Sequence, residues 1–296
     1  MNAIRKSIVT VCILVCLTGG ICENANAQES LESTQFHSDD HNFTSRINDD
    51  SGAPFSPGVD TVRMLFSALE FEPQVSNIPL QRSFSLMHQG ENVCVVNKIK
   101  TPQRDEQFLI SLPLNFYHSQ RLYQLKTLPP IPEKYLNHNS EVLSISQVLK
   151  HFSDSSLIVP RDYSYGENVD NDLATIESDN LISISNSVYY ERFMQLFEQN
   201  RAEFALIFPL SLYQYFGEDL PIDVRRYAIA NNPAFVSGRF ICADTPVNQT
   251  TLKRINSAIV QLYQSSSFLK VHQRYVQEEE WPSLERHIQQ KINKTY

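Results

Sequence analysis

Helical and strand-like segments alternate along this chain in two successive series, and this alternation limits the folds that the chain can adopt. The first series covers about residues 59–112 and the second about 146–208, with the proline-rich run 128–132 between them. Strands that alternate with helices are typical of a parallel sheet with helices packed on its faces. We therefore predict an α/β chain with two lobes, in which the proline-rich run marks the passage between lobes or an insertion at the start of the second.

The ends of each series agree with this prediction. The first helix has apolar residues at i, i+3, i+4 and i+7, which places them on one face: Val62, Leu65, Phe66 and Leu69. After the second series come two strand-like runs, 225–230 and 235–242, and a helical C-terminus that we expect to pack back on the first lobe.

The first 27 residues have the parts of a secretory signal peptide. Arg5 and Lys6 form a basic start, residues 8–17 are apolar, and Ala25-Asn26-Ala27 is a cleavage site of the small-x-small type. We expect a mature chain that begins at Gln28 and lies in the periplasm. Residues 28–54 are rich in Ser, Asp and Asn and show little apolar periodicity beyond a strand-like run at 34–37, so we predict a loosely ordered lead-in.

The charge of the chain argues against several classes of partner. Its formal net charge is -8, and removal of the signal peptide, with two bases and one acid, makes this -9. An acidic chain without a basic block is not expected to bind nucleic acid or an anionic membrane. Catalytic and phosphate-binding motifs are absent from the sequence, which has only eight glycines, so we predict neither a cofactor nor a metal ion.

Two cysteines, Cys94 and Cys242, remain after the signal peptide is removed. In an exported protein such a pair favours one disulfide, and the alternative is two buried free thiols.

One stretch, residues 90–114, carries the candidate binding chemistry. It reads as a buried strand at Val93–Val96, a polar turn with Thr101 and Arg104, and a second apolar run that Pro113 closes. An arginine raised on a turn between buried strands can present its planar guanidinium to an anion. This arrangement indicates a binding protein.

The same stretch resembles the signature of the family 3 extracellular solute-binding proteins, the periplasmic amino-acid receptors of ABC importers. The signature has a glycine, a short strand, T-x-x-R and an apolar segment that ends in S-x-P. These correspond to Gly90, Val93–Val96, Thr101–Arg104 and Ser111-Leu112-Pro113. With Cys94 and Lys100-Thr101, the stretch is similar to a branch of the family that keeps the cysteine and a K-T-x-x-R turn.

The resemblance implies a periplasmic-binding-protein type II fold, with two α/β lobes joined by two crossover strands. The first lobe is then 55–124 plus 230–296, and the second is 125–229. A small solute is expected in the cleft between them, bound by a monomer that delivers it to an ABC permease or reports it to a membrane sensor. By resemblance, Arg104 beside Thr101 grips a carboxylate, and Ser164 and Tyr165 contribute from the second lobe. Arg82 either lines the cleft or caps a helix end.

Two positions depart from the family pattern. Phe208 stands where the family has the acid that grips an ammonium group, and Ile99 stands where it has a serine or threonine. We therefore expect a small anionic solute and leave its class open: a less polar or aromatic-bearing anion is as plausible as an ordinary free amino acid. Two alternatives to transport remain: a sensor or partner protein of the same fold, and a dehydratase-like enzyme with Glu106 or Glu167 as its acid.

Overall fold

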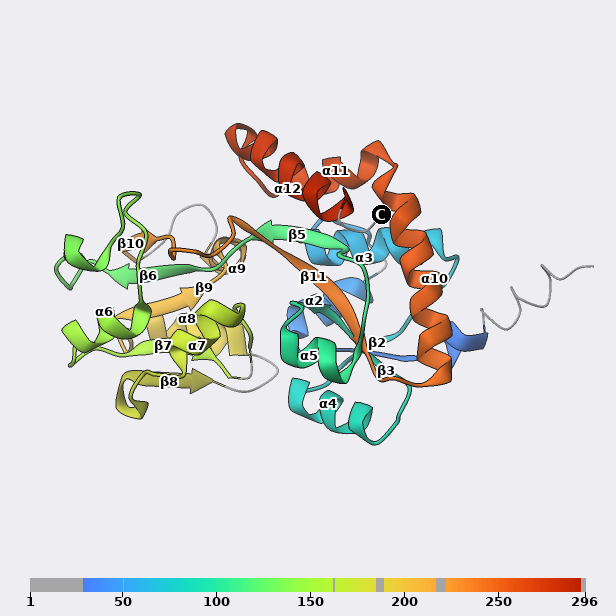
Figure 1. Cartoon of the computed structure of the whole chain (residues 1–296), viewed down its shortest axis with the longest axis horizontal. Helices are drawn as coiled ribbons and strands as arrows, with labels where there is room; N and C mark the ends of the chain where they lie inside the picture. Colours follow the sequence, from blue (N-terminus) through green and yellow to red (C-terminus); the bar gives the residue numbers. More distant parts are fainter. Residues whose placement is uncertain (1–28, 50, 162, 185–188, 217–221, 294–296) are drawn as a thin grey trace, which may run out of the picture.

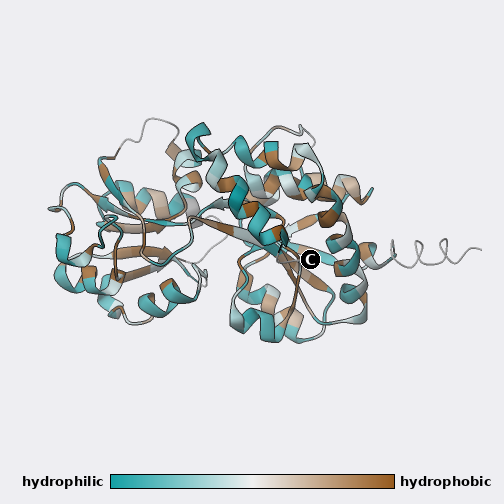
Figure 2. Cartoon of the chain, turned by 45° about the horizontal axis from the view of Figure 1, so that its top comes forward, coloured by the Kyte–Doolittle hydropathy of each residue, from teal (hydrophilic) through white to brown (hydrophobic). Residues whose placement is uncertain are grey.

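Two lobes, each built on its own mixed sheet, make up the molecule (Figure 1). The structure, a computed structural model, describes five ranges of the chain: 29–49, 51–161, 163–184, 189–216 and 222–293. The predicted signal peptide lies outside these ranges. Within them, no helix combines the length and the apolar character that are needed to cross a bilayer. The strands of both sheets are mostly apolar, while the outer faces of the helices are mostly hydrophilic (Figure 2).

The sheet of the first lobe has the strand order β2-β1-β3-β11-β4, and β5 also pairs with β11. β1 runs parallel to β2 and β3, whereas β11 is antiparallel to β3, β4 and β5. Its strands are β1 (Gln35–Ser38), β2 (Val75–Asn77), β3 (Val93–Lys98), β4 (Leu109–Ile110), β5 (Asn115–His118) and β11 (Phe235–Cys242). Its helices are α2 (His41–Ile47), α3 (Pro57–Ala68), α4 (Leu80–His88), α5 (Pro102–Gln107), α10 (Pro246–Tyr263), α11 (Ser266–Gln273) and α12 (Trp281–Asn293).

Residues 28–54, predicted to be a loosely ordered lead-in, instead supply β1 and α2. β1 lies between β2 and β3, with Phe36 opposite Cys94. Phe36 is 2% exposed, and its ring meets Phe66 of α3 edge-on at 5.2 Å between centroids. The prediction of a loosely ordered lead-in was wrong. β1 has only four residues and Phe36 is its one large apolar side chain, so the sequence there shows no apolar periodicity. The strand predicted at 34–37 is present one residue further along, as β1.

Helix α3 is the helix that the apolar spacing predicts. It begins where Ser56 Oγ accepts a hydrogen bond from the Val59 backbone N–H at 3.1 Å, with Pro57 in the first turn. Its buried face, which includes Val62 and Leu65, packs into the core of the first lobe. The Ser56 cap sets where α3 begins, and the apolar face sets which side of α3 is buried.

The second lobe has the strand order β10-β6-β9-β7-β8. β7 is parallel to β8 and β9, while β6 is antiparallel to β9 and β10. Along β9, Phe204 and Leu206 enter the core on one face of the sheet, and Ala205 and Ile207 enter the core on the other. The strands are β6 (Arg121–Leu125), β7 (Leu157–Pro160), β8 (Leu181–Ile184), β9 (Phe204–Ile207) and β10 (Val224–Tyr227). The helices are α6 (Ile145–His151), α7 (Glu167–Leu173), α8 (Tyr189–Glu198) and α9 (Pro209–Phe216).

The chain passes between lobes between β5 and β6, at Ser119 and Gln120, and again between β10 and β11. β6 pairs only with strands of the second sheet among the described residues, although the sequence placed residues up to 124 in the first lobe. The proline-rich run 128–132 follows this crossing and lies inside the second lobe. Ile131 is 4% exposed there, in the core against one face of the second sheet.

Cys94 and Cys242 form a disulfide between β3 and β11. The two residues face each other in the antiparallel pairing, with their Cα atoms 4.0 Å apart, and both are fully buried. The predicted bridge is thus confirmed, and it joins residues 148 positions apart in the sequence.

We expect replacement of both cysteines by alanine to lower the free energy of unfolding by about 4–5 kcal/mol. A cross-link that closes so long a loop restricts the unfolded chain, and chain-entropy models assign it a stabilisation of this size. Urea unfolding of the double variant and of the oxidised parent measures the difference. If the double variant unfolds at the same urea concentration as the parent, and with the same dependence of free energy on urea, the bridge does not stabilise the fold.

Two histidines of the C-terminal helices, His272 fully buried and His287 partly buried, predict a dependence of stability on pH. His272 of α11 and His287 of α12 lie against Phe116, with ring centroids 5.5 Å and 5.9 Å from it. Burial lowers the pKa of each from 6.5 to about 4; for His272 a hydrogen bond to the Phe268 carbonyl oxygen opposes this, and for His287 the charge of Lys291 adds to it. Between pH 6.5 and 4 the unfolded chain therefore binds protons that the folded protein does not.

We accordingly expect stability to fall as the pH drops from 6.5 toward 4, by up to about 1.4 kcal/mol per pH unit for His272. The variant His272→Phe keeps a ring at this site but removes the titration, so its unfolding free energy should depend less on pH. Thermal unfolding from pH 7 to 4 for both proteins tests this. Parallel pH profiles would contradict the assignment.

Candidate functional site

A small cavity lies between the lobes, at the carboxyl end of β3, whose last residue Lys98 lines it. In open α/β sheets this is the edge at which ligands bind. Its volume is about 30 Å³, room for about two water molecules. The first lobe contributes Leu80, Asn97, Lys98, Ile99, Arg104 and Tyr117, and the second contributes Tyr163, Ser164 and Phe208.

Arg104 lies on α5, a short helix where the sequence indicated a turn. Thr101 caps this helix, its Oγ1 accepting a hydrogen bond from the Arg104 backbone N–H at 3.2 Å. The Arg104 guanidinium donates from Nη1 to the Ile99 carbonyl oxygen at 2.7 Å and lies 5.6 Å from the Phe84 ring centroid. Thr101 is 7% exposed and positions the arginine rather than lining the cavity.

The guanidinium of Arg104 is partly buried. Among the described residues, no acid lies within 4.0 Å of it. Burial lowers the pKa of Arg104, and the negative charges of Asp170 and Asp39 act in the opposite direction. Because an arginine keeps its charge even so, the cavity has a cation that a carboxylate could pair with.

The turn of the second lobe is held by Asp170 of α7. Ser164 Oγ donates to Asp170 Oδ2 at 2.5 Å, and the Tyr165 backbone N–H donates to Asp170 Oδ1 at 2.7 Å. The backbone N–H of Gly166 donates to Ser164 Oγ at 3.3 Å. These backbone donors are therefore engaged inside the lobe in this structure. Ser164 still lines the cavity, whereas Tyr165 is 2% exposed and lies behind it.

Aromatic rings form the walls of the cavity. Phe208 follows β9 at the position where an acid was missing from the sequence pattern, and it is 9% exposed. Its ring meets Tyr117 of the first lobe edge-on, with centroids 5.2 Å apart. Tyr163 lines the cavity from the second lobe. The walls suit a solute with an apolar or aromatic part.

The other sequence candidates lie away from the cavity. Arg82 is exposed on α4 and does not line it; together with burial, which is the larger cause, its charge lowers the pKa of His37. Glu106 on α5 and Glu167 on α7 are exposed and do not line it either. The structure therefore brings Arg104 and Ser164 together and leaves the two candidate acids outside.

Sequence reasoning missed an ion pair between Lys98 and Asp39. Lys98 ends β3 and Asp39 directly follows β1, so the parallel pairing of these strands puts both side chains at the cleft edge. Their side chains are each 9% exposed and form a salt bridge. The Lys98 ammonium also lies 5.2 Å from the centroid of the Tyr163 ring. The signal that could have found them is their position after two parallel strands.

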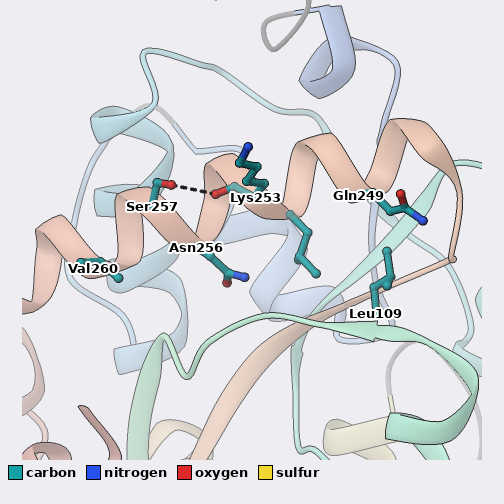
Figure 3. Close-up of a pocket in the computed structure, with 7 residues that line it drawn as sticks. Leu109, Gln249, Lys253, Asn256, Ser257 and Val260 are labelled. Carbon is teal, nitrogen blue, oxygen red and sulfur yellow. Dashed lines mark hydrogen bonds between the residues drawn. The ribbon is translucent and has the colours of Figure 1, made fainter. Parts of the chain in front are cut away.

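A second hollow, on the surface between α10 and β4, is a weaker candidate (Figure 3). Its polar side chains serve the fold: Asn256 Oδ1 accepts from the Leu112 backbone N–H at 2.8 Å, and Ser257 Oγ donates to the Lys253 carbonyl oxygen at 3.0 Å. Leu109, Leu252 and Val260 supply apolar contacts. This hollow does not bring charged groups and aromatic rings together as the cavity between the lobes does.

Comparisons with known proteins find similar folds among the solved structures. No protein-family model and no curated protein matches the sequence. An ancestral arginine-binding protein bound to arginine superposes with a TM-score of 0.60 at 12% identity, over 83% of this chain and 100% of that one. ArtJ from Geobacillus stearothermophilus, an arginine-, lysine-, histidine-binding protein, gives 0.57 at 10% identity, over 82% and 94%.

A histidine kinase sensor domain with similarity to periplasmic binding proteins gives a TM-score of 0.59 at 12% identity, over 82% of this chain and 96% of that domain. These likenesses show that the chain has the periplasmic-binding-protein type II fold. The similar structures named here are binding proteins and a sensor domain. At such low identity the ligand must be argued from the cleft itself.

The Lys98–Asp39 pair predicts a marked loss of stability when one partner is removed. In Lys98→Met the carboxylate of Asp39 stays buried without its cation, and we expect a loss of about 3 kcal/mol in unfolding free energy. The double variant Lys98→Met/Asp39→Leu should recover most of that loss. Urea unfolding of the parent, both single variants and the double variant measures the coupling; additive losses would show that the pair contributes nothing.

Proposed function

We propose that this chain captures a small solute with a carboxylate and an aromatic or apolar part, in the cleft between its lobes. The observation that carries the proposal is the Arg104 guanidinium, partly buried and without an acidic partner among the described residues. A carboxylate can accept two parallel hydrogen bonds from such a group. The rings of Tyr117, Tyr163 and Phe208 offer apolar surface for the rest of the solute.

The likeness to arginine-binding proteins does not by itself extend to their ligand. In this cleft Phe208 follows β9 with an apolar ring, and Asp39 is already paired with Lys98. The described residues that line the cavity include no carboxylate with which an ammonium or guanidinium group could pair. These features support an acid without a cationic group.

Entry of a solute requires the lobes to separate. The cavity of about 30 Å³ is too small for any carboxylic acid with an aromatic part. Contacts across the cleft must break first, among them the hydrogen bond from Gln214 Nε2 to the Phe55 carbonyl oxygen at 2.7 Å and the contact of Tyr117 with Phe208. The crossings between β5 and β6 and between β10 and β11 are the places where such a hinge motion would bend.

For the cellular role, we favour an exported receptor that works with an ABC permease. The signal-peptide pattern and the fold shared with an amino-acid ABC transporter protein support this. A sensor role is the second candidate, because the fold is shared equally well with a kinase sensor domain. Cross-linking of the exported protein in membranes, followed by mass spectrometry, distinguishes the two: a permease subunit supports transport and a kinase supports sensing.

Arg104 should determine the affinity for the solute. A thermal-shift screen over organic acids, amino acids, peptides and sugars would identify ligands, and calorimetry would then give their dissociation constants. We expect Arg104→Ala to weaken binding about 10- to 100-fold, the scale of a lost charge-assisted pair. Arg82→Ala is the matched control, because it removes an equal charge from an exposed site outside the cleft. Equal affinity of the Arg104 variant and the parent would refute the site.

A further inference from the structure

The side chain of Lys98 lies in the cleft as if it were a bound cation. It starts from the end of β3 in the first lobe, and its ammonium group contacts Asp39 of the same lobe and the ring of Tyr163 of the opposite lobe. The distance from Nζ to the Tyr163 ring centroid is 5.2 Å, within the range of a cation–π contact. A carboxylate and an aromatic face are the two groups that recognise an ammonium or guanidinium ion.

We infer that Lys98 determines specificity: it occupies the cation subsite formed by Asp39 and Tyr163, and so excludes solutes that carry an ammonium or guanidinium group. This inference rests on the proposal that the cleft is the binding site, and it names the class of solute that the site rejects.

Two other acids in the described part of the chain near the cleft, Asp40 and Asp170, are already engaged. The Asp40 carboxylate accepts a hydrogen bond from the Phe43 backbone N–H at 3.0 Å and caps α2. Asp170 accepts two hydrogen bonds from the turn of the second lobe. An entering cation would therefore have to displace Lys98 itself, and it would also be repelled by Arg104.

Removal of the ammonium group of Lys98 should convert the cleft into a cation-binding site. In Lys98→Met the apolar stem remains, while Asp39 and Tyr163 are left for an external cation. Agmatine and cadaverine are suitable probes because they carry no carboxylate and need no contact with Arg104. We expect no calorimetric binding of either to the parent at millimolar concentration, and at least about tenfold tighter binding to Lys98→Met, the scale of a regained partly buried ion pair.

Three further variants make the test specific. Lys134→Met removes a lysine that lies exposed over the Tyr135 ring, at 4.8 Å from its centroid, and should gain no amine binding. Lys98→Met/Asp39→Asn should lose the gain, because the carboxylate is gone. Lys98→Gln can still hydrogen-bond Asp39 without a charge, and it replaces Lys98→Met if that variant does not fold.

Two results would overturn the inference: binding of agmatine to the parent as tight as to Lys98→Met, or no gain in either folded Lys98 variant. A different result would show that the proposed function is wrong. In that case Arg104→Ala binds the anionic solute as tightly as the parent, whatever the amines do.

Discussion

The molecule depends on β11, which runs from the hinge into the core of the first lobe. Its first half, from Phe235 to Gly238, pairs with β5 next to the crossing, and its second half pairs with β3 and β4. The disulfide then fixes it to β3. Gly238 stands at the change of partner, where a Cβ would lie 2.2 Å from Asn97 Oδ1 and 2.3 Å from Asn115 Oδ1. Asn97 lines the cleft, so the packing that fixes this strand also fixes the floor of the site.

Much of this could be read from the sequence because the signals are local. The apolar spacing of α3, the strand that contains Cys94 and the T-x-x-R turn that carries Arg104 each lie within a few neighbouring residues. The disulfide could be predicted because only two cysteines remained to pair. Phe208 could be placed because it directly follows a strongly apolar strand.

The parts that could not be predicted depend on contacts between distant residues. Lys98 and Asp39 are 59 positions apart and meet only because β1 and β3 pair in parallel. β1 itself is short and mostly polar at the sequence level, and what makes it a strand is its place between two others. The hydrogen bonds of Asp170 to the Ser164 turn likewise became visible only once the helix and the turn were positioned.

The small size of the closed cavity has a consequence for any affinity that is measured. Three contacts across the cleft stabilise the closed form: the Tyr117–Phe208 ring contact, the Gln214 hydrogen bond and the Lys98 side chain that spans the lobes. A solute that binds only the open form then competes with the protein's own closed state. Its apparent affinity is lower than its intrinsic affinity by the fraction of molecules that are open, about a hundredfold if one molecule in a hundred is open. Substitutions that weaken these contacts across the cleft can therefore raise the apparent affinity without changing any contact with the solute.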